Sequence, residues 1–166
     1  PAANTDRAVT AMIDAHPYEE VAYDLYPLAQ EGPARGLGRV GNLPSPVKFT
    51  ELIQLVKKAL NVPYIRYGGE GEEFVDRIAV CGGSGADLWP VARAMGADVL
   101  VTGDVKYHAA RDMLAEGIKF VDAGHYGTEK VVIELLSNYL KKRVREKGMD
   151  VEVLPSKKGF DPFRIA

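Results

Sequence analysis

Hydrophobic residues recur along the chain in two regular patterns, one typical of helices and one typical of strands. Helical spacing predicts helices at Asp6–Ala15, Lys48–Leu60, Val105–Glu116 and Thr128–Arg145. Alternating or continuously apolar runs predict strands at Val21–Tyr26, Leu37–Leu43, Pro63–Tyr67, Val75–Cys81, Asp98–Thr102, Ile118–Val121 and Val151–Leu154. In the last helix one stripe is expected to face inward, formed by Val132, Leu135, Leu136, Tyr139 and Leu140.

Helices and strands alternate through the second part of the chain. This order predicts an α/β fold with a mainly parallel or mixed sheet flanked by helices. The pattern changes at Pro44–Pro46, after a stretch dense in glycine and proline. We therefore expect a boundary that divides the chain into residues 1–43 and residues 44–166.

Composition narrows the class of protein. The hydrophobic fraction of 46% is ordinary for a chain with a core, and the formal net charge of −2 gives no reason to expect binding to nucleic acid or to an acidic membrane. Cys81 is the one cysteine, so no internal disulfide can form and a reducing, cytoplasmic setting is expected. The sequence begins at Pro1 without methionine, which fits either a piece of a longer chain or removal of an initiator methionine.

Three segments that carry small or ionisable residues follow predicted strands: "CGGSG", "TGDVKYH" and "DAGHYGTE". Ligands of parallel sheets collect at the carboxyl ends of the strands, so these segments are the best pointer to a site. His125 and Glu129 come first, because an imidazole and a carboxylate together suit Zn, Fe(II), Mn or Ni. If the helix begins near Thr128, His125 lies on the loop and Glu129 in the first turn, and both can converge above the sheet. The alternative to a metal site is structural: His125 is an ordinary loop histidine, and Glu129 is there because the helix dipole favours an acidic side chain near a helix N-terminus.

Asp104 and His108 are also four residues apart, and Asp104 follows the strand predicted at Asp98–Thr102 through the Thr102–Gly103 turn. Asp104 can cap the helix predicted to begin at Val105, or it can belong to the site. His108 can be a ligand, a general acid or base, or a core histidine.

Other patterns favour structural roles. Gly36, Gly38 and Gly41 match G-x-G-x-x-G, but prolines follow and no helix opens there, so we reject a dinucleotide site. "CGGSGADLW" can hold an anion on its backbone, yet a tight turn packed against neighbouring loops is the favoured interpretation. His16 with two following glutamates can bind metal or form a turn.

The runs "LVTGDVKYHAARDM" and "FVDAGHYGTEKVV", with the closing "DPFRI", resemble the C-terminal half of the Nif-three-like dinuclear-metal-centre family, whose bacterial members are named GTP cyclohydrolase 1 type 2 homologues. "AHPYEEVAYDLYPL" and "GLGRVGNL" resemble the end of an extra domain of these proteins, which is similar to the ferredoxin-like fold of PII and CutA proteins. We therefore expect a partial appendage of that fold before the α/β domain.

The resemblance implies a hexamer built as a dimer of trimers, with two divalent metal ions per site (Zn, Fe, Mn or Mg). His125 and Glu129 match the histidine and glutamate that ligate metal in the family. Asp104 and His108 match residues that line the same pocket, and we assign them catalytic roles, such as proton transfer by His108, instead of ligation.

The family's first half supplies a histidine pair and an aspartate, and nothing here matches that half. The chain has three histidines, His16, His108 and His125, so it is expected to be a C-terminal fragment whose metal site is incomplete. The first functional hypothesis is metal-assisted hydrolysis of a small, nucleotide-like substrate. The alternatives are a non-catalytic metal-binding or regulatory assembly and an interaction module that acts through self-association.

Overall fold

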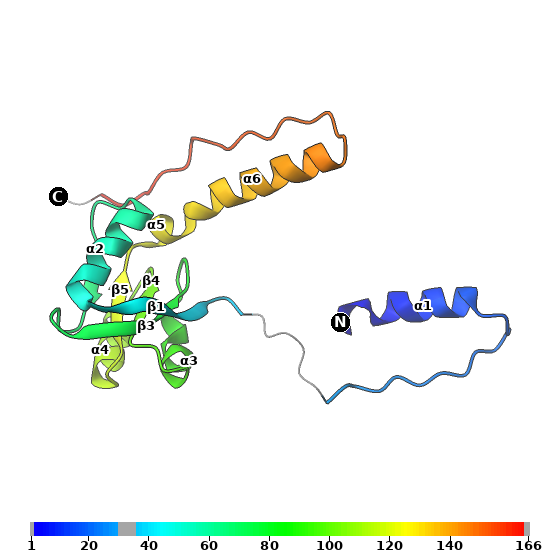
Figure 1. Ribbon diagram of the computed structural model, residues 1–166, viewed down its shortest axis with the longest axis horizontal. Coiled ribbons are helices and arrows are strands. Elements are labelled where there is room, and N and C mark those ends of the chain that lie inside the picture. The colour runs from blue at the N-terminus through cyan, green and yellow to red at the C-terminus, as the bar shows by residue number, and fades with distance from the viewer. Residues whose placement is uncertain (1, 30–35, 165–166) are drawn as a thin grey trace. The chain divides into compact units, whose positions relative to one another are not determined.

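The computed structural model describes residues 2–29 and 36–164 (Figure 1). The chain forms two compact units, Pro1–Gly36 and Leu37–Ala166. The boundary expected after residue 43 falls inside a strand of the second unit, β1 (Arg39–Lys48). The prolines fit there because β1 is an edge strand whose register with its neighbour shifts between Asn42 and Val47.

The first unit contains a turn of 3-10 helix at Ala2–Asn4 and the helix α1 (Thr5–Ala15), which confirms the first predicted helix. The strand predicted at Val21–Tyr26 is wrong, because this stretch has no ladder partner among residues 2–29 and 36–164 and its large side chains are exposed. An alternating pattern forms a strand only where a second strand is available to pair with it. The ferredoxin-like appendage is therefore not confirmed.

The second unit is built on a five-stranded sheet in the order β1-β3-β4-β5-β2. Its remaining strands are β2 (Arg66–Gly68), β3 (Phe74–Val80), β4 (Val99–Thr102) and β5 (Lys119–Asp122). The three central strands β3, β4 and β5 are parallel, and both edge strands are antiparallel to their neighbours. The predicted mixed α/β sheet is confirmed.

Helices cover both faces of this sheet (Figure 1). On these faces lie α2 (Phe49–Leu60), the 3-10 turn Ala86–Leu88, α3 (Trp89–Ala94) and α4 (Tyr107–Ala115). The last two helices, α5 (His125–Glu129) and α6 (Val131–Glu146), follow β5, and α6 extends away from the sheet (Figure 1). On the face toward α2, Phe49 packs with Val99 and Val121; on the face toward α3 and α4, Leu100 and Phe120 pack with Met113. Because successive residues of one strand point to opposite faces, β4 and β5 supply both cores; β4 is fully buried, and β5 is buried except at Lys119.

The C-terminal part of the chain departs from the prediction. The helix expected at Thr128–Arg145 begins earlier, at His125, and is divided into α5 and α6 at Lys130. The strand expected at Val151–Leu154 is wrong: both edges of the sheet are taken by β1 and β2, and this stretch is extended without a ladder partner in the described part of the chain.

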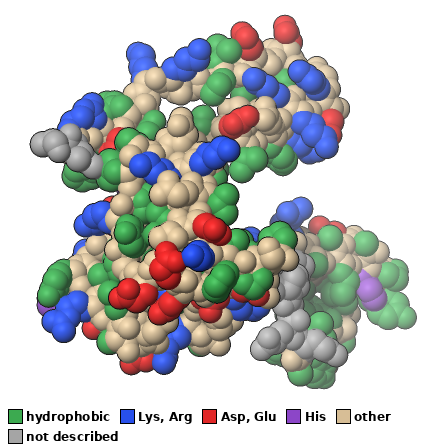
Figure 2. Space-filling model, turned by 60° about the vertical axis from the view of Figure 1, so that its left-hand side comes forward, with side chains coloured by type: hydrophobic (Ala, Val, Ile, Leu, Met, Phe, Trp, Pro, Cys, Tyr) green, Lys and Arg blue, Asp and Glu red, His purple; other side chains and the backbone are tan. Residues whose placement is uncertain are grey.

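The inward stripe predicted for the last helix is also wrong. Leu135 is 69% exposed and Tyr139 is 59% exposed, and the other members of the stripe are exposed as well. Figure 2 shows hydrophobic side chains at the surface in the upper part of the view, among Lys and Arg side chains. Helical spacing identified the apolar side of α6 but not a layer to cover it.

No helix within residues 2–29 and 36–164 is long and apolar enough to cross a membrane.

Candidate metal site

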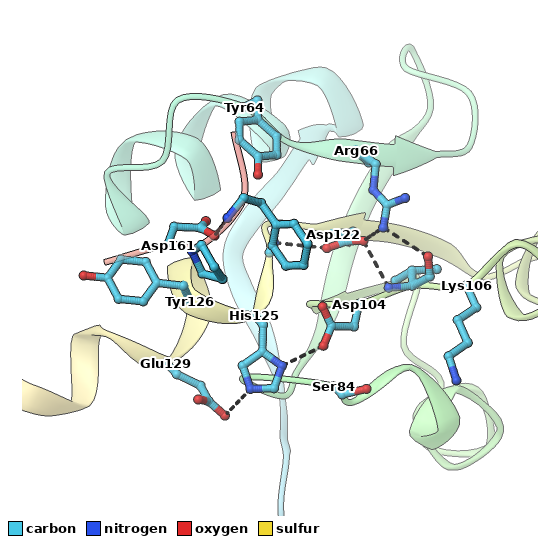
Figure 3. Close-up of a pocket in the computed structure, with 14 residues that line it drawn as sticks. Tyr64, Arg66, Ser84, Asp104, Lys106, Asp122, His125, Tyr126, Glu129 and Asp161 are labelled. Atoms are coloured by element: carbon cyan, nitrogen blue, oxygen red, sulfur yellow. Dashed lines mark hydrogen bonds and ion pairs between the residues drawn. The ribbon is translucent and has the colours of Figure 1, made fainter. Parts of the chain in front are cut away.

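The three segments singled out in the sequence meet at one edge of the sheet. They follow the parallel strands β3, β4 and β5, whose carboxyl ends lie together because the strands are neighbours in register. A pocket of about 970 Å³ opens there. The residues that line it are Tyr64, Arg66, Ser84, Asp104, Val105, Lys106, Asp122, Gly124, His125, Tyr126, Glu129, Asp161, Pro162 and Phe163 (Figure 3).

His125 and Glu129 face each other at this pocket. Both lie on α5, one helical turn apart, so their side chains project from the same side of the helix. The His125 Nε2 atom is 3.2 Å from Glu129 Oε1, and about half of each side chain is accessible to solvent. The two groups predicted as metal ligands therefore converge, although His125 begins the helix instead of lying on the preceding loop.

Asp104 holds the opposite side of the imidazole. Its Oδ2 atom lies 2.6 Å from His125 Nδ1, and this contact is drawn in Figure 3. Asp104 does not cap α4: the N-cap position is Lys106 and no side chain caps that helix. The Asp104 backbone has φ +56°, a left-handed conformation that costs an L-residue roughly 1–2 kcal/mol, although aspartate tolerates it better than most.

This arrangement changes the acid–base behaviour of His125. The hydrogen bond with Asp104 is the largest cause that raises the pKa of His125 above its ordinary value of 6.5, partial desolvation opposes it, and the nearby charges of Glu129 and Asp104 raise the pKa further. Both ring nitrogens face carboxylate oxygens, so the protonated imidazole can donate to both. When His125 loses a proton and keeps the Nδ1–H bond to Asp104, the Nε2 lone pair faces Glu129 and is free to bind a cation.

A glycine turn after β3 packs directly on this pair. At Gly83, which has φ +67°, an added Cβ would lie 2.4 Å from Glu129 Oε1 and 3.4 Å from His125 Cε1. The Gly83 N–H donates to Thr128 Oγ1 (2.9 Å), and the Gly85 N–H donates to Thr102 Oγ1 (2.9 Å). These amides bond to side chains of α5 and β4, as the interpretation of "CGGSG" as a packed turn expects.

His108 is not brought into this cluster. It lies in the first turn of α4, is exposed, and contacts the Tyr107 ring edge-on at 5.4 Å between ring centroids. It is not among the residues that line the pocket in the described part of the chain, so its catalytic role stays a prediction. His16 lies in the first unit and its Nδ1 accepts the Tyr18 N–H (3.1 Å), as the turn interpretation expects.

The sequence did not single out Asp122 and Arg66. Asp122 ends β5 with 3% of its surface exposed, and Arg66 pairs with it across the β2–β5 ladder. The Arg66 guanidinium forms an ion pair with Asp122 and donates to the Val105 carbonyl (3.1 Å). The sequence did contain a signal for Asp122: it is a carboxylate at the end of a buried strand, two residues before Gly124.

The donor set of the chain fits part of a divalent-metal site. An imidazole nitrogen and a carboxylate oxygen 3.2 Å apart, with a second carboxylate on the other ring nitrogen, is the usual environment of a metal-binding histidine. Within residues 2–29 and 36–164, no group of three or more His, Cys, Asp or Glu side chains is arranged to hold a metal ion. The described residues thus bring two candidate donors together, His125 and Glu129.

Comparisons with known proteins agree with the resemblance. The family model described as Duf34/NIF3 (NGG1p interacting factor 3) matches residues 5–162. The "GTP cyclohydrolase 1 type 2 homolog" of Halalkalibacterium halodurans is 45% identical over 158 residues, which are 95% of this chain and 42% of that protein. The protein of the same name from Bacillus subtilis is 40% identical over 155 residues, 93% of this chain and 41% of that protein.

The solved structures give the same result. A Bacillus cereus protein described as related to NIF3 shares 38% identity with a TM-score of 0.89, over 100% of this chain and 45% of that one. A Staphylococcus aureus protein, SA1388, shares 32% identity with a TM-score of 0.84, over 99% of this chain and 47% of that one. The chain therefore spans less than half the length of each of these four relatives.

Proposed function

Because the chain belongs to the Duf34/NIF3 family, we propose that it forms part of a metal-dependent hydrolase acting on a small, nucleotide-like substrate. One observation carries the proposal: His125 Nε2 and Glu129 Oε1 lie 3.2 Å apart, while Asp104 occupies the other ring nitrogen at 2.6 Å. Both donors lie at the carboxyl edge of the parallel strands and open into the pocket.

His125 and Glu129 would hold the metal, and Asp104 would keep the imidazole in the tautomer whose Nε2 is unprotonated. A bound divalent metal supplies Lewis acidity at the reacting centre. Glu129 ends α5 and its carboxylate is partly exposed, so it can also accept a proton from the substrate side. The cytoplasmic setting belongs to this proposal, because Cys81 is a free thiol that a reducing environment would preserve.

The walls of the pocket support a substrate with a flat ring. Tyr64, Tyr126 and Phe163 line the pocket. Figure 3 shows the Tyr126 side chain on the opposite side of the pocket from Lys106, with Tyr64 at the top of the view. A base can stack on aromatic rings, and the Lys106 ammonium is a cation for an anionic group, so the pocket suits a ring joined to phosphate.

The test of the proposal is metal binding followed by turnover. We expect the 166-residue chain to bind Zn²⁺ with low affinity, and a protein of the relatives' full length to bind it more tightly, because the chain offers two donors. His125→Ala should remove binding in both, while His16→Ala, a histidine of the first unit, should leave it unchanged. Full-length protein loaded with metal should then hydrolyse a member of a nucleotide and phosphoester panel, and this activity should disappear with His125→Ala.

A second candidate function is a metal-binding or regulatory assembly without turnover. It is favoured by the donor count, since among the described residues only the His125 Nε2 atom and the Glu129 carboxylate converge as donors for a metal ion. We propose self-association as part of either function, because the apolar side chains of α6 are exposed. Stoichiometric metal binding without hydrolysis of any compound in the panel would favour this candidate, and light scattering would test the association.

A further inference from the structure

We propose that Arg66 and Asp122 are positioning residues that hold Asp104 against His125 and so set the orientation and tautomer of the imidazole in the candidate metal site. The inference rests on the proposed function, because it assigns a role within the same site. Both residues act through the backbone, at Val105 and at Gly124.

Asp122 joins the two loops that carry the site. Its Oδ2 atom accepts the N–H of Val105 (3.0 Å), and its Oδ1 atom accepts the N–H of Gly124 (3.0 Å). Val105 follows Asp104 and Gly124 precedes His125, so one carboxylate fixes the backbone beside both paired side chains. The carboxylate is 3% exposed, and displacement of either loop would leave a buried charge without its donor.

Arg66 completes the hold on Val105. Its Nη2 atom donates to Asp122 Oδ2 and to the Val105 carbonyl (3.1 Å), so the N–H of Val105 is bound by Asp122 and its C=O by Arg66. Figure 3 shows these contacts beside the Asp104–His125 pair. The Val105 side chain is buried in the core on the α4 side, which anchors the same residue from below.

The backbone on the other side of Asp104 is equally constrained. A Cβ at Gly103 would lie 2.7 Å from the Gly124 carbonyl carbon and 2.7 Å from the His125 nitrogen, so the two loops pack backbone against backbone. Asp104 lies between this contact and the fixed Val105 peptide, with its left-handed φ of +56°. A residue in this conformation persists where its surroundings determine it, and here they direct its carboxylate to His125 Nδ1.

A network that served only to stabilise the fold would behave differently. Its loss would lower stability but leave the imidazole unchanged, because Asp104 and His125 could still meet. A positioning role predicts a change at the imidazole itself: with Asp104 loosened, the proton of the neutral ring is shared between Nδ1 and Nε2, and fewer molecules present a bare Nε2 to a metal.

The first test uses Arg66→Met in the 166-residue chain without metal. The Arg66 side chain is 67% exposed on an edge strand, and methionine keeps its apolar stem, so the fold is expected to persist. Nitrogen-15 NMR of the histidine rings, at a pH where His125 is neutral, should show mainly the Nδ1–H tautomer in the parent chain. Arg66→Met should increase the Nε2–H tautomer, and unchanged tautomer populations would overturn the inference.

The second test is a double-mutant cycle on Zn²⁺ affinity, measured by calorimetry for Arg66→Met, Asp104→Asn and the combined variant. Changing an outer partner of a ligating histidine costs about 10–100-fold in metal affinity, so we expect a loss near the upper part of that range for Asp104→Asn and about three- to tenfold for Arg66→Met. In the Asp104→Asn background the Arg66→Met loss should vanish. Losses that multiply in the combined variant would show that Arg66 acts independently of Asp104.

Arg77→Met is the matched control. Arg77 also donates to a backbone carbonyl, that of Met95 (2.8 Å), and to a side-chain oxygen, Asn42 Oδ1 (2.6 Å), but outside the pocket. It should change neither the His125 tautomer nor the Zn²⁺ affinity, and an effect equal to that of Arg66→Met would count against a specific role. His125→Ala separates the two proposals: Zn²⁺ binding that survives it refutes the proposed function, while the tautomer measurement still decides the positioning inference.

Discussion

Gly83 leaves no room for a side chain beside Glu129: a Cβ added at Gly83 would lie 2.4 Å from Glu129 Oε1. The glycine turn after β3 is therefore one wall of the His125–Glu129 pair. Glu129 is a flexible, partly exposed side chain, so it can move away without disturbing the fold.

We predict that Gly83→Ala moves the Glu129 carboxylate and weakens Zn²⁺ binding by about tenfold or more, because even changes beside a ligand typically cost about 10–100-fold in metal affinity. It should also destabilise the chain by roughly 1–2 kcal/mol, because Gly83 has φ +67°. Gly117→Ala is the control: Gly117 has φ +78° and no atom within 4 Å of an added Cβ. It should cost similar stability in urea denaturation and leave Zn²⁺ affinity unchanged. Equal metal affinities in the two variants would contradict this account.

Much of the second unit follows from local patterns. β4 and β5 are short strands whose apolar residues are buried on both faces of the sheet, and this burial leaves such a run few alternatives. The convergence of His125 with Glu129 follows from their spacing of four residues on one helix, and the parallel strands bring the loop that carries Asp104 to the same edge.

The remaining features depend on contacts that spacing cannot reveal. Thr128 is a residue type that often begins a helix. Here the helix begins earlier, at His125, and the Thr128 hydroxyl donates to the Gly124 carbonyl (2.9 Å). The Arg66–Asp122 pair joins residues 56 positions apart through an antiparallel ladder, and no local signal marks that pairing. The alternating run at Val21–Tyr26 lacks a partner strand among the described residues, which periodicity does not report.

The raised pKa of His125 gives a prediction about pH. In the metal-free chain, NMR titration should give His125 a pKa above 6.5, and Asp104→Asn should lower it more than Glu129→Gln, because the hydrogen bond with Asp104 is the largest cause of the shift. The folded-state pKa is raised, so the stabilisation from the charged imidazole is fully present below the unfolded value and is lost as pH rises through the folded value. The stability difference between the parent chain and Asp104→Asn should therefore shrink from acidic to alkaline pH. A difference that grows with pH would show that the charged imidazole is not the stabilised form.

Thr102 is predicted to support the glycine turn. It is fully buried, and its Oγ1 atom accepts the Gly85 N–H (2.9 Å) and donates to the Gly83 carbonyl (3.1 Å). Thr102→Val keeps the shape but removes both bonds, so we expect a loss of about 1–3 kcal/mol in the free energy of unfolding and weaker Zn²⁺ binding. Thr102→Ser keeps the hydroxyl and loses a methyl group, so it should cost about 1 kcal/mol and preserve metal affinity. If serine and valine weaken Zn²⁺ binding equally, the hydroxyl is not what shapes the turn.

Phe163 tests the flat-ring substrate. The turn that presents it is held by its own bonds, with the Phe163 N–H donating to Asp161 Oδ1 (3.0 Å), and the preceding segment is tied to α5 where the Tyr126 hydroxyl donates to the Gly159 carbonyl (3.1 Å). Phe163 is 70% exposed although it lines the pocket, whereas Phe160, 68% exposed on the same segment, does not line it. Stacking of a base on an aromatic ring is worth about 1–3 kcal/mol, so Phe163→Ala should weaken binding of GTP by about tenfold and Phe160→Ala should not. Calorimetry with inorganic triphosphate, which has no ring, should show no effect of either variant. Equal losses for GTP and triphosphate would mean that Phe163 shapes the pocket without contacting a base.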